Sequence, residues 1–335
     1  MRAAVVTRFG GPDVLKLAER PDPVPGDGQV VIAVEFADTL FLETGVRSGA
    51  GQDYWPMRPP YIPGNGVAGR IIQAGDGADS ALLGRRVVAH TGGEGGYADR
   101  AVVAASEVSA IPDGLGLDAA AALLHDGATA LALFGATKIS AGDTVLIVGA
   151  SGGLGVLSLQ LGRARAAAVI AVARGAKLDQ VRELRPDAVI DSGRPDWLDQ
   201  ARAALPEAGA DVVLDNIGGA LGEASFALTA DGGRFSGHGT PAGRFAQIGR
   251  EAARSRGITV TGIEAVQLSG EQLKRYTEQA LTEAAAGHLA PVIGQVFSLE
   301  QAAAAHAAIE SRSVFGKTLL TTARFTQDAA ASRKG

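Results

Sequence analysis

The sequence contains no cysteine, which excludes disulfide bonds, iron–sulfur clusters, thiolate nucleophiles and cysteine-ligated zinc. Positive charge is in short supply, because 31 lysines and arginines accompany 36 aspartates and glutamates and give a formal charge of −5. Nucleic-acid binders usually carry a basic face, and RNA binders combine it with aromatic clusters that this chain lacks. We therefore expect no nucleic-acid partner.

Long apolar runs of the kind found in membrane proteins are also missing. The first eight residues include Arg2 and Arg8 and hold too short an apolar run for a signal peptide. The longest uncharged stretch, residues 144–162, contains five glycines, two serines and a glutamine, which is unfavourable for a membrane span. We expect a cytoplasmic protein with no membrane partner.

Glycine is abundant, with 46 residues in a chain of 335, or roughly twice its average usage. The length suits two domains. Up to about residue 120 the chain is rich in turns and short β segments, and prolines at 56, 59, 60 and 63 rule out a helix there. We expect an irregular β-domain from residues 1–120 and 264–335, interrupted by a second domain at 121–263.

The second domain alternates apolar strands with alanine-rich helices. A helix is expected from Asp118 towards Lys138, with Gly127 as its weak point. The expected strands then follow at residues 144–148, 169–173, 188–190, 212–214, 233–236 and 258–261. Short apolar strands in such a series predict an α/β fold, a doubly wound parallel Rossmann sheet with helices on both faces.

The turn after the first of these strands is the most informative segment. Residues 145–148 form an apolar strand, glycines follow, and an apolar helix opens at residue 156. Ala150, Gly152 and Gly155 occupy the three positions of a G-x-G-x-x-G turn, with alanine replacing the first glycine. Gly152 would let the backbone approach a pyrophosphate at the helix N-terminus. The alternative is a glycine-rich packing turn without a ligand.

The end of the following strand distinguishes NADP from NAD. An acidic residue there would bind the ribose 2′-hydroxyl of NAD. The sequence instead places Arg174 and Lys177 after residues 169–173, and these cations can bind a 2′-phosphate. The alternative is two solvated surface cations, and we expect NADPH as the cofactor.

Several motifs resemble those of zinc-independent, zeta-crystallin-like quinone oxidoreductases in the medium-chain dehydrogenase/reductase superfamily. They cover nearly the whole chain and comprise Gly10–Leu15, Pro63–Gly69, Gly95–Ala98, Ala150–Gly155, Asp215–Gly219, Leu299–Ala303, His306, Ile309–Arg312 and Gly316–Lys317. The resemblance implies that the N- and C-terminal segments form a GroES-like β-domain. It also implies hydride delivery from NADPH to a quinone or an activated alkene, which needs less polarisation than a ketone.

The chain is a poor match to the zinc-dependent relatives. Asn65, in Gly64-Asn65-Gly66, replaces a family ligand histidine, and the cysteine ligands have no counterpart. The five histidines show no H-x-x-x-H or H-E-x-x-H spacing. We expect no metal site and no zinc.

The resemblance also assigns cofactor contacts by position. They fall on Thr129, Ala150, Ser151, Gly152, Gly153, Leu154, Arg174, Lys177, Ser192, Asn216, Gly239 and Lys317. The segment near the nicotinamide departs from the family, because Leu40 stands for an asparagine and Glu43 for an aspartate. Ser192 falls where relatives present tyrosine.

The catalytic group is left open. Candidate proton donors are Tyr54, Tyr61, His125 and Glu43. Tyr54, Trp55 and Tyr61 are candidate acceptor contacts, because relatives line the acceptor cleft with this loop. The alternative for the tyrosines and the tryptophan is ordinary packing of aromatics in an irregular loop. A solvated or capping pair with Asp126 explains His125, and a structural anchor explains Glu43.

Two other functions compete with quinone reduction. One is an enone or enoyl reductase, which needs a proton at the carbon beside the one that receives hydride. The other is a non-catalytic NADPH-binding protein. The resemblance further suggests a homodimer that pairs through the sheet edge, at residues 234–239 and 258–262.

Overall fold

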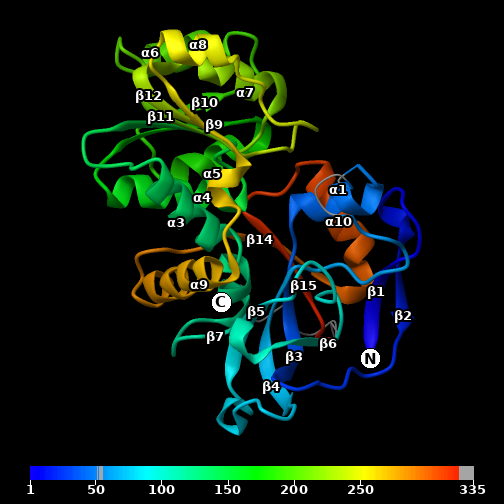
Figure 1. Ribbon diagram of the computed structural model, residues 1–335. Coiled ribbons are helices and arrows are strands. Elements are labelled where there is room, and N and C mark those ends of the chain that lie inside the picture. The colour runs from blue at the N-terminus through cyan, green and yellow to red at the C-terminus, as the bar shows by residue number, and fades with distance from the viewer. Residues whose placement is uncertain (51, 53–55, 324–335) are drawn as a thin grey trace. The chain divides into compact units, whose positions relative to one another are not determined.

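The computed structural model describes residues 1–50, 52 and 56–323. The chain forms two compact units (Figure 1). The terminal unit comprises Met1–His125 and Ile293–Gly335, and the central unit comprises Asp126–Val292. The sequence predicted these boundaries at 120/121 and 263/264, which would place residues 264–292 with the terminal segments. In the structure, helix α9 (Gly270–Ala285) groups with the central unit instead.

The central unit is built on a six-stranded sheet in which every pairing is parallel. Its strand order is β10-β9-β8-β11-β12-β13. The bounds are β8 Thr144–Val148, β9 Ala168–Ala173, β10 Ala188–Asp191, β11 Ala210–Asp215, β12 Thr229–Gly237 and β13 Thr259–Thr261. All six expected strands are present. The order reverses between β8 and β11, and ligands of such sheets bind at this switch point.

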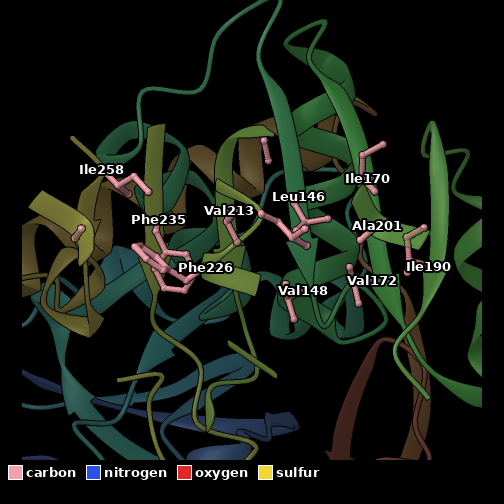
Figure 2. Close-up of a cluster of buried hydrophobic side chains, with 13 residues drawn as sticks. Leu146, Val148, Ile170, Val172, Ile190, Ala201, Val213, Phe226, Phe235 and Ile258 are labelled. Atoms are coloured by element: carbon pink, nitrogen blue, oxygen red, sulfur yellow. The ribbon is translucent and has the colours of Figure 1, made fainter. Parts of the chain in front are cut away.

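Helices cover both faces of this sheet. They are α3 Asp126–Ala136, α4 Gly153–Ala164, α5 Leu178–Glu183, α6 Trp197–Ala204, α7 Gly219–Phe226 and α8 Arg250–Ser255, and α9 packs against α3. One apolar cluster runs across the strands from Ile258 to Ile190 and includes side chains of α6, α7 and α8 (Figure 2). Leu146 and Val148 of β8 point into it, while the alternate residues Val145 and Ile147 are equally buried. Alternate residues face opposite sides, so both faces are covered.

The terminal unit contains a seven-stranded mixed sheet and a two-stranded one. The large sheet has the order β14-β15-β3-β4-β5-β7, with β6 also on β3, and β1 pairs with β2. The bounds are β1 Arg2–Val6, β2 Leu15–Glu19, β3 Gln29–Asp38, β4 Gly66–Ala74, β5 Arg86–His90, β6 Arg100–Ala104, β7 Val108–Ala110, β14 Ile293–Ser298 and β15 Lys317–Thr321. β15 runs antiparallel to β3, so the last segment completes the first domain, as expected (Figure 1).

The helices of the terminal unit are α1 Phe41–Ser48, α2 Leu117–Leu123 and α10 Ala302–Glu310. The short 3₁₀ turns of the chain are Pro12–Val14, Ser80–Leu82, Ala105–Glu107, Gly175–Lys177, Ile263–Val266 and Leu299–Gln301. Instead of one helix from Asp118 towards Lys138, the chain forms α2 and α3 with a break at His125. The His125 side chain is held by Asp38 at this break.

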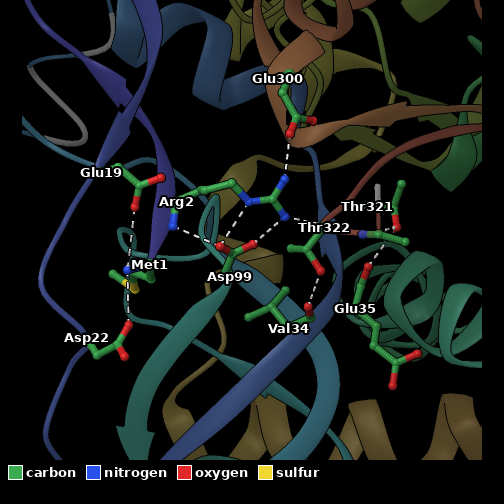
Figure 3. A network of polar contacts seen from close by, with 11 residues as sticks. Met1, Arg2, Glu19, Asp22, Val34, Glu35, Asp99, Glu300, Thr321 and Thr322 are labelled. Carbon is green, nitrogen blue, oxygen red and sulfur yellow. Dashed lines mark hydrogen bonds and ion pairs between the residues drawn. The ribbon is translucent and has the colours of Figure 1, made fainter. Parts of the chain in front are cut away.

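Arg2 joins three distant segments of the terminal unit (Figure 3). Its guanidinium lies 2.7 Å from Asp99 Oδ1 and 2.5 Å from Glu300 Oε1, and it donates to the carbonyl of Thr322 at 2.6 Å. The hydrogen bond to Asp99 raises the pKa of Arg2. No single helix in the described part of the chain is long and apolar enough to cross a membrane, and α2 and α3 would reach that length only together.

Candidate functional site

The glycines of the turn between β8 and α4 have different structural roles. Gly149 adopts φ +79°, and its N–H and that of Ala150 both donate to the carbonyl of Val172 at 3.0 Å. The left-handed turn therefore falls on Gly149, one residue before the position that the sequence motif assigned to Ala150. A Cβ at Gly155 would lie 2.4 Å from the oxygen of Gly149, so only glycine fits there.

Gly152 behaves differently. A Cβ built on it would have one protein atom within 4 Å, the oxygen of Gly149 at 3.8 Å. Gly152 is also the N-cap of α4, where no side chain caps the helix and no acidic residue lies in the first turn. The protein itself leaves space beside this backbone, and the exposed N–H groups of a helix start favour an anion. Ser151, Gly153 and Leu154 flank the same opening.

The carboxyl ends of β9 and β10 carry the candidate 2′-phosphate residues. Arg174 follows β9 directly and is exposed, and Lys177 is half-buried one turn later. Ser192 follows β10, and its N–H and hydroxyl donate to the carbonyl of Ala173 at 2.8 and 3.1 Å. The carboxylate of Asp191 accepts the N–H of Gly193 at 2.9 Å. Three of the expected cofactor residues thus lie at one edge of the sheet.

A series of hydrogen bonds holds three side chains in place at the carboxyl ends of β11 and β12. Asn216 donates its side-chain amide to the carbonyl of Val148 at 2.8 Å, and its Oδ1 lies 2.8 Å from Nε2 of His238. Nδ1 of His238 lies 3.1 Å from the hydroxyl of Ser236. Burial lowers the pKa of His238 to about 4, so the ring is neutral. Nε2 therefore carries the proton and donates to Asn216, which fixes the orientation of the amide.

Gly239 and His238 lie at the same edge of the sheet, beyond the end of β12. Gly239 leaves no room for a side chain, because a Cβ would lie 1.9 Å from the backbone carbon of Asn216. His238 was missed by sequence reasoning. Its signal was its place just after a predicted strand and just before Gly239, at the carboxyl edge where such sheets bind ligands. Thr129 lies half-buried on α3 of the central unit.

A buried cluster of ionisable groups occupies the terminal unit where β3 ends and β15 begins. Asp38 is 0% exposed, with Oδ2 2.6 Å from Nδ1 of His125 and Oδ1 2.7 Å from Nζ of Lys317, which is 5% exposed. Nε2 of His125 lies 3.2 Å from Nδ1 of His90. Lys317 and His125, predicted for different roles, thus meet on one carboxylate.

The charges of this cluster compensate one another. Burial acts to raise the pKa of Asp38, but Lys317 and His125 outweigh it and hold that pKa below its ordinary value. Burial, and then the neighbouring His125 ring, lower the pKa of His90 to about 3. The cluster therefore contains a charged carboxylate, a cation and a neutral imidazole.

Glu43 serves a second network in the terminal unit. Oε2 accepts the hydroxyl of Tyr97 at 2.6 Å and the N–H of Leu40 at 2.9 Å, and Oε1 accepts the N–H of Asn65 at 2.9 Å. Burial raises the pKa of Glu43 despite these donors. Tyr97 also contacts Nε2 of His306 at 3.1 Å. The contacts of Glu43 are those of a structural anchor that fixes the start of α1 beside Asn65.

The remaining catalytic candidates are less informative. Tyr61 is buried, its backbone bridges to Val6, and burial raises its pKa to about 12. It lines a small hollow of the terminal unit with Leu42, Glu43, Val46, Met57, Pro63, Asn65 and Gly93. Tyr54 and Trp55 lie outside the described residues. Among the residues that the structure describes, no three histidine, aspartate or glutamate side chains are grouped to hold a metal ion.

Two family models match parts of this chain. Residues 26–113 match the model of the alcohol dehydrogenase GroES-like domain, and residues 184–320 match that of zinc-binding dehydrogenases. A quinone oxidoreductase of Sus scrofa is 32% identical over 329 residues, covering 96% of this chain and 97% of the relative. The chain belongs to the quinone oxidoreductase family of the medium-chain dehydrogenase/reductase superfamily. It is therefore an oxidoreductase of that superfamily.

Solved structures of similar proteins share this fold. A mycobacterial protein complexed with NADPH has a TM-score of 0.87 and 27% identity, covering 96% of this chain and 99% of that one. A protein described as an NAD-dependent alcohol dehydrogenase has a TM-score of 0.86 and 28% identity, covering 96% and 100%.

Proposed function

We propose that this protein uses NADPH to deliver hydride to quinones or related conjugated acceptors. The observation that carries the proposal is the opening at Gly152. Gly149 and Gly155 are glycine because the protein's own turn and packing require it, whereas Gly152 leaves its backbone accessible at a helix N-terminus. The mycobacterial relative complexed with NADPH supports this choice of cofactor.

The residues of the central unit would hold the cofactor along the carboxyl edge of the sheet. Ser151, Gly152, Gly153 and Leu154 offer backbone donors for the pyrophosphate. Arg174 and Lys177, with Ser192 beside them, offer a charged site for the 2′-phosphate. NADPH, when bound, supplies the hydride. Asn216, Gly239 and Thr129 would position the rest of the molecule.

Lys317 differs from the other cofactor candidates, because it is buried in the terminal unit against Asp38. We propose that its ammonium serves as the counter-charge of Asp38, and the family resemblance alone names it as a cofactor contact. Next to the Glu43 network, Leu40 presents an apolar side chain where relatives carry an amide. An acceptor with a conjugated, apolar ring suits such surroundings, because it holds developing negative charge by conjugation.

A second candidate function is enone reduction, in which hydride adds to carbon and the neighbouring carbon then needs a proton. The contact between His125 and the Asp38 carboxylate at 2.6 Å favours it, because histidine can carry a proton near neutral pH. Fold alone does not separate these reactions, since one fold supports many chemistries.

The proposal is tested by oxidation of NADPH and NADH with a matched panel of quinones, enones, enals and simple ketones. Arg174→Ala is assayed beside the parent, and Arg202→Ala, an exposed cation on α6 that pairs with Asp199, is the control. We expect NADPH-selective turnover of quinones or enones. Arg174→Ala should lose roughly tenfold in selectivity, the size of one charge-assisted hydrogen bond.

Each other outcome has a definite meaning. Turnover of simple ketones alone would contradict the conjugated acceptor, and unchanged selectivity in Arg174→Ala would contradict the phosphate site. A protein that binds NADPH yet reduces no acceptor in the panel would support a non-catalytic role instead.

We also propose a homodimer that forms through the edge of the central sheet. β13 is the last strand on that side, and Val260 on it is 40% exposed. An exposed edge strand offers unpaired backbone groups to a second copy. Light scattering that gives a monomer mass would contradict this proposal.

A further inference from the structure

The carboxyl ends of β9 and β10 bring a carboxylate beside the candidate 2′-phosphate residue Arg174. Asp191 is the last residue of β10 and pairs in register with Ala173, the last residue of β9, which Arg174 follows directly. Oδ1 of Asp191 and Cγ of Arg174 lie 3.0 and 3.9 Å from the position that a Cβ on Gly193 would take. Two side chains of opposite charge therefore flank one glycine at the rim of the sheet.

The loop after β10 holds this carboxylate in place. Oδ1 of Asp191 accepts the N–H of Gly193 at 2.9 Å, and its backbone carbonyl accepts the N–H of Arg194 at 3.1 Å. Between them, Ser192 ties the loop to the end of β9 through its two hydrogen bonds to Ala173. The protein's own contacts thus fix the carboxylate beside the residue that precedes Arg174.

Both charged groups have hydrogen-bonding capacity left over. Among the residues that the structure describes, Arg174 makes no hydrogen bond or ion pair, and Oδ2 of Asp191 accepts no hydrogen bond. Arg194 pairs with Asp196 at 3.0 Å and interacts with Asp191 only through longer-range electrostatic attraction. A guanidinium and a carboxylate oxygen are therefore both available to a ligand at this rim.

The two groups suit the two forms of a nicotinamide dinucleotide. A 2′-phosphate is negatively charged and suits the planar guanidinium of Arg174. A ribose 2′-hydroxyl carries a proton that a carboxylate can accept, which is the role of the acidic residue in NAD sites. The same carboxylate repels a phosphate, because both are negative. The acid that is missing after β9 is thus present at the end of the neighbouring strand.

We propose that Asp191 is a specificity-determining residue that allows the site to bind NADH as well as NADPH. Its Oδ2 accepts the 2′-hydroxyl of NADH, whereas Arg174 binds the 2′-phosphate of NADPH against the repulsion of Asp191. The preference for NADPH is therefore reduced but not abolished. This inference rests on the proposed function and deepens it by naming a second cofactor.

The test measures the dissociation constants of NADPH and NADH by fluorescence titration for the parent, Asp191→Asn, Arg174→Ala and the double variant. Asparagine keeps an oxygen that can accept the N–H of Gly193 while it removes the negative charge. Asp187→Asn is the matched control. Asp187 lies at the other end of the same strand, and its carboxylate likewise accepts one backbone N–H, that of Val169 at 2.7 Å.

Two further measurements separate the local effect from a disturbed fold. Calorimetric titration with adenosine 2′,5′-bisphosphate and with AMP limits the comparison to the adenosine end, because these probes differ only in the 2′-phosphate. Thermal unfolding is recorded for every variant. If Asp191→Asn does not fold, Asp191→Ser replaces it, because a serine hydroxyl can also accept the N–H of Gly193.

We expect Asp191→Asn to bind NADPH roughly tenfold more tightly and NADH roughly tenfold more weakly, the size of one interaction with a charged group. Arg174→Ala should weaken NADPH binding and leave NADH binding nearly unchanged, since Asp191 still accepts the hydroxyl. The double variant should bind NADH as weakly as Asp191→Asn does. Asp187→Asn should match the parent with both cofactors.

Three results would overturn the role of Asp191 while the proposed function stands. They are a parent that binds NADPH but not NADH, an Asp191→Asn variant that binds both cofactors as the parent does, and one that weakens both equally. A parent that binds neither cofactor would contradict the proposed function itself, and the role of Asp191 with it.

Discussion

The two units of this protein place their polar groups in opposite ways. The terminal unit buries ionisable side chains, namely Asp38, Glu43, Arg47, Tyr97, His306 and Lys317. The large cluster of the central unit is apolar throughout, and the buried Asp215, Ser236 and His238 lie at or just beyond the carboxyl ends of strands. A parallel sheet covered on both faces has room for chemistry mainly at its rim, whereas the mixed sheet holds charge inside by pairing it.

The two units should therefore be destabilised by different kinds of substitution. Charge removal should damage the terminal unit, because a buried ion left alone is costly. Loss of a glycine should damage the central unit, because its turn depends on close backbone approach.

Removal of the Lys317 ammonium should have the largest effect. Lys317→Met removes the cation beside the buried Asp38 carboxylate and leaves it in contact with His125. We expect a loss of about 3 kcal/mol in the free energy of unfolding, typical of a broken buried pair. Urea unfolding at pH 7 measures it.

Lys177→Met is the matched control, since Lys177 is half-buried at the sheet rim. Its unfolding free energy should change by about 0.5 kcal/mol or less. Equal losses in the two variants would contradict the contrast between a buried and a rim lysine.

Acid should destabilise the terminal unit more than the central one. Burial lowers the pKa of His90 and His306 to about 3 in the terminal unit and that of His238 to about 4 in the central unit, from an ordinary 6.5. Between pH 6.5 and those values the unfolded chain binds protons that the folded chain does not. The free energy of unfolding therefore decreases as the pH is lowered. Each such histidine accounts for about 3 kcal/mol by pH 4.

Other groups do not reverse this difference. The raised pKa values of Glu43 and Asp215 act in the opposite direction, with one such carboxyl in each unit. Hydrogen exchange at pH 7 and pH 5 should show earlier loss of protection in β3 and β5 than in β8 and β11. Trp197 packs on the central cluster, so its fluorescence in a Trp55→Phe variant reports that unit separately. If the central unit unfolded first in acid, the buried histidines would not control which unit is lost first.

Gly155 and Gly152 should respond in opposite ways to alanine. Gly155→Ala forces a Cβ against the oxygen of Gly149, so we expect about 2 kcal/mol of destabilisation from overpacking. The Cβ introduced by Gly152→Ala has little contact with the protein, so the free energy of unfolding should be nearly unchanged. The same Cβ should weaken NADPH binding. Calorimetry of unfolding and NADPH titration separate the two. Tight NADPH binding by Gly152→Ala would count against the phosphate site.

The smallest effect should follow from loss of the His238 hydrogen bond. His238→Phe leaves Oδ1 of Asn216 without its donor, at a cost of about 1 kcal/mol. His238→Gln keeps a donor and should restore part of it. We expect the KM for NADPH to rise in the phenylalanine variant with less change in kcat. Identical KM values in both variants would argue against a positioning role for His238.

Much of the fold could be predicted because its signals are local. Apolar runs and glycines gave all six strands of the central sheet and the return of the last segment to the first domain. The one helix expected from Asp118 was wrong in extent, because His125 breaks it at the contact with Asp38. That contact joins residues 87 positions apart, and no local propensity contains it.

Local features of the sequence were enough to predict the class of the protein. They comprise the strands of a parallel sheet, a glycine-rich turn of the phosphate-binding type, cations after β9 and motifs of an oxidoreductase family. Three features became apparent only in the folded chain: Lys317, His125 and His90 gather around Asp38, Glu43 anchors α1, and His238 orients Asn216. Periodicity and turn chemistry act over a few residues and can be recognised along the chain. Partnerships of buried charges depend on which strand ends meet in space, and that is settled only when the sheets form.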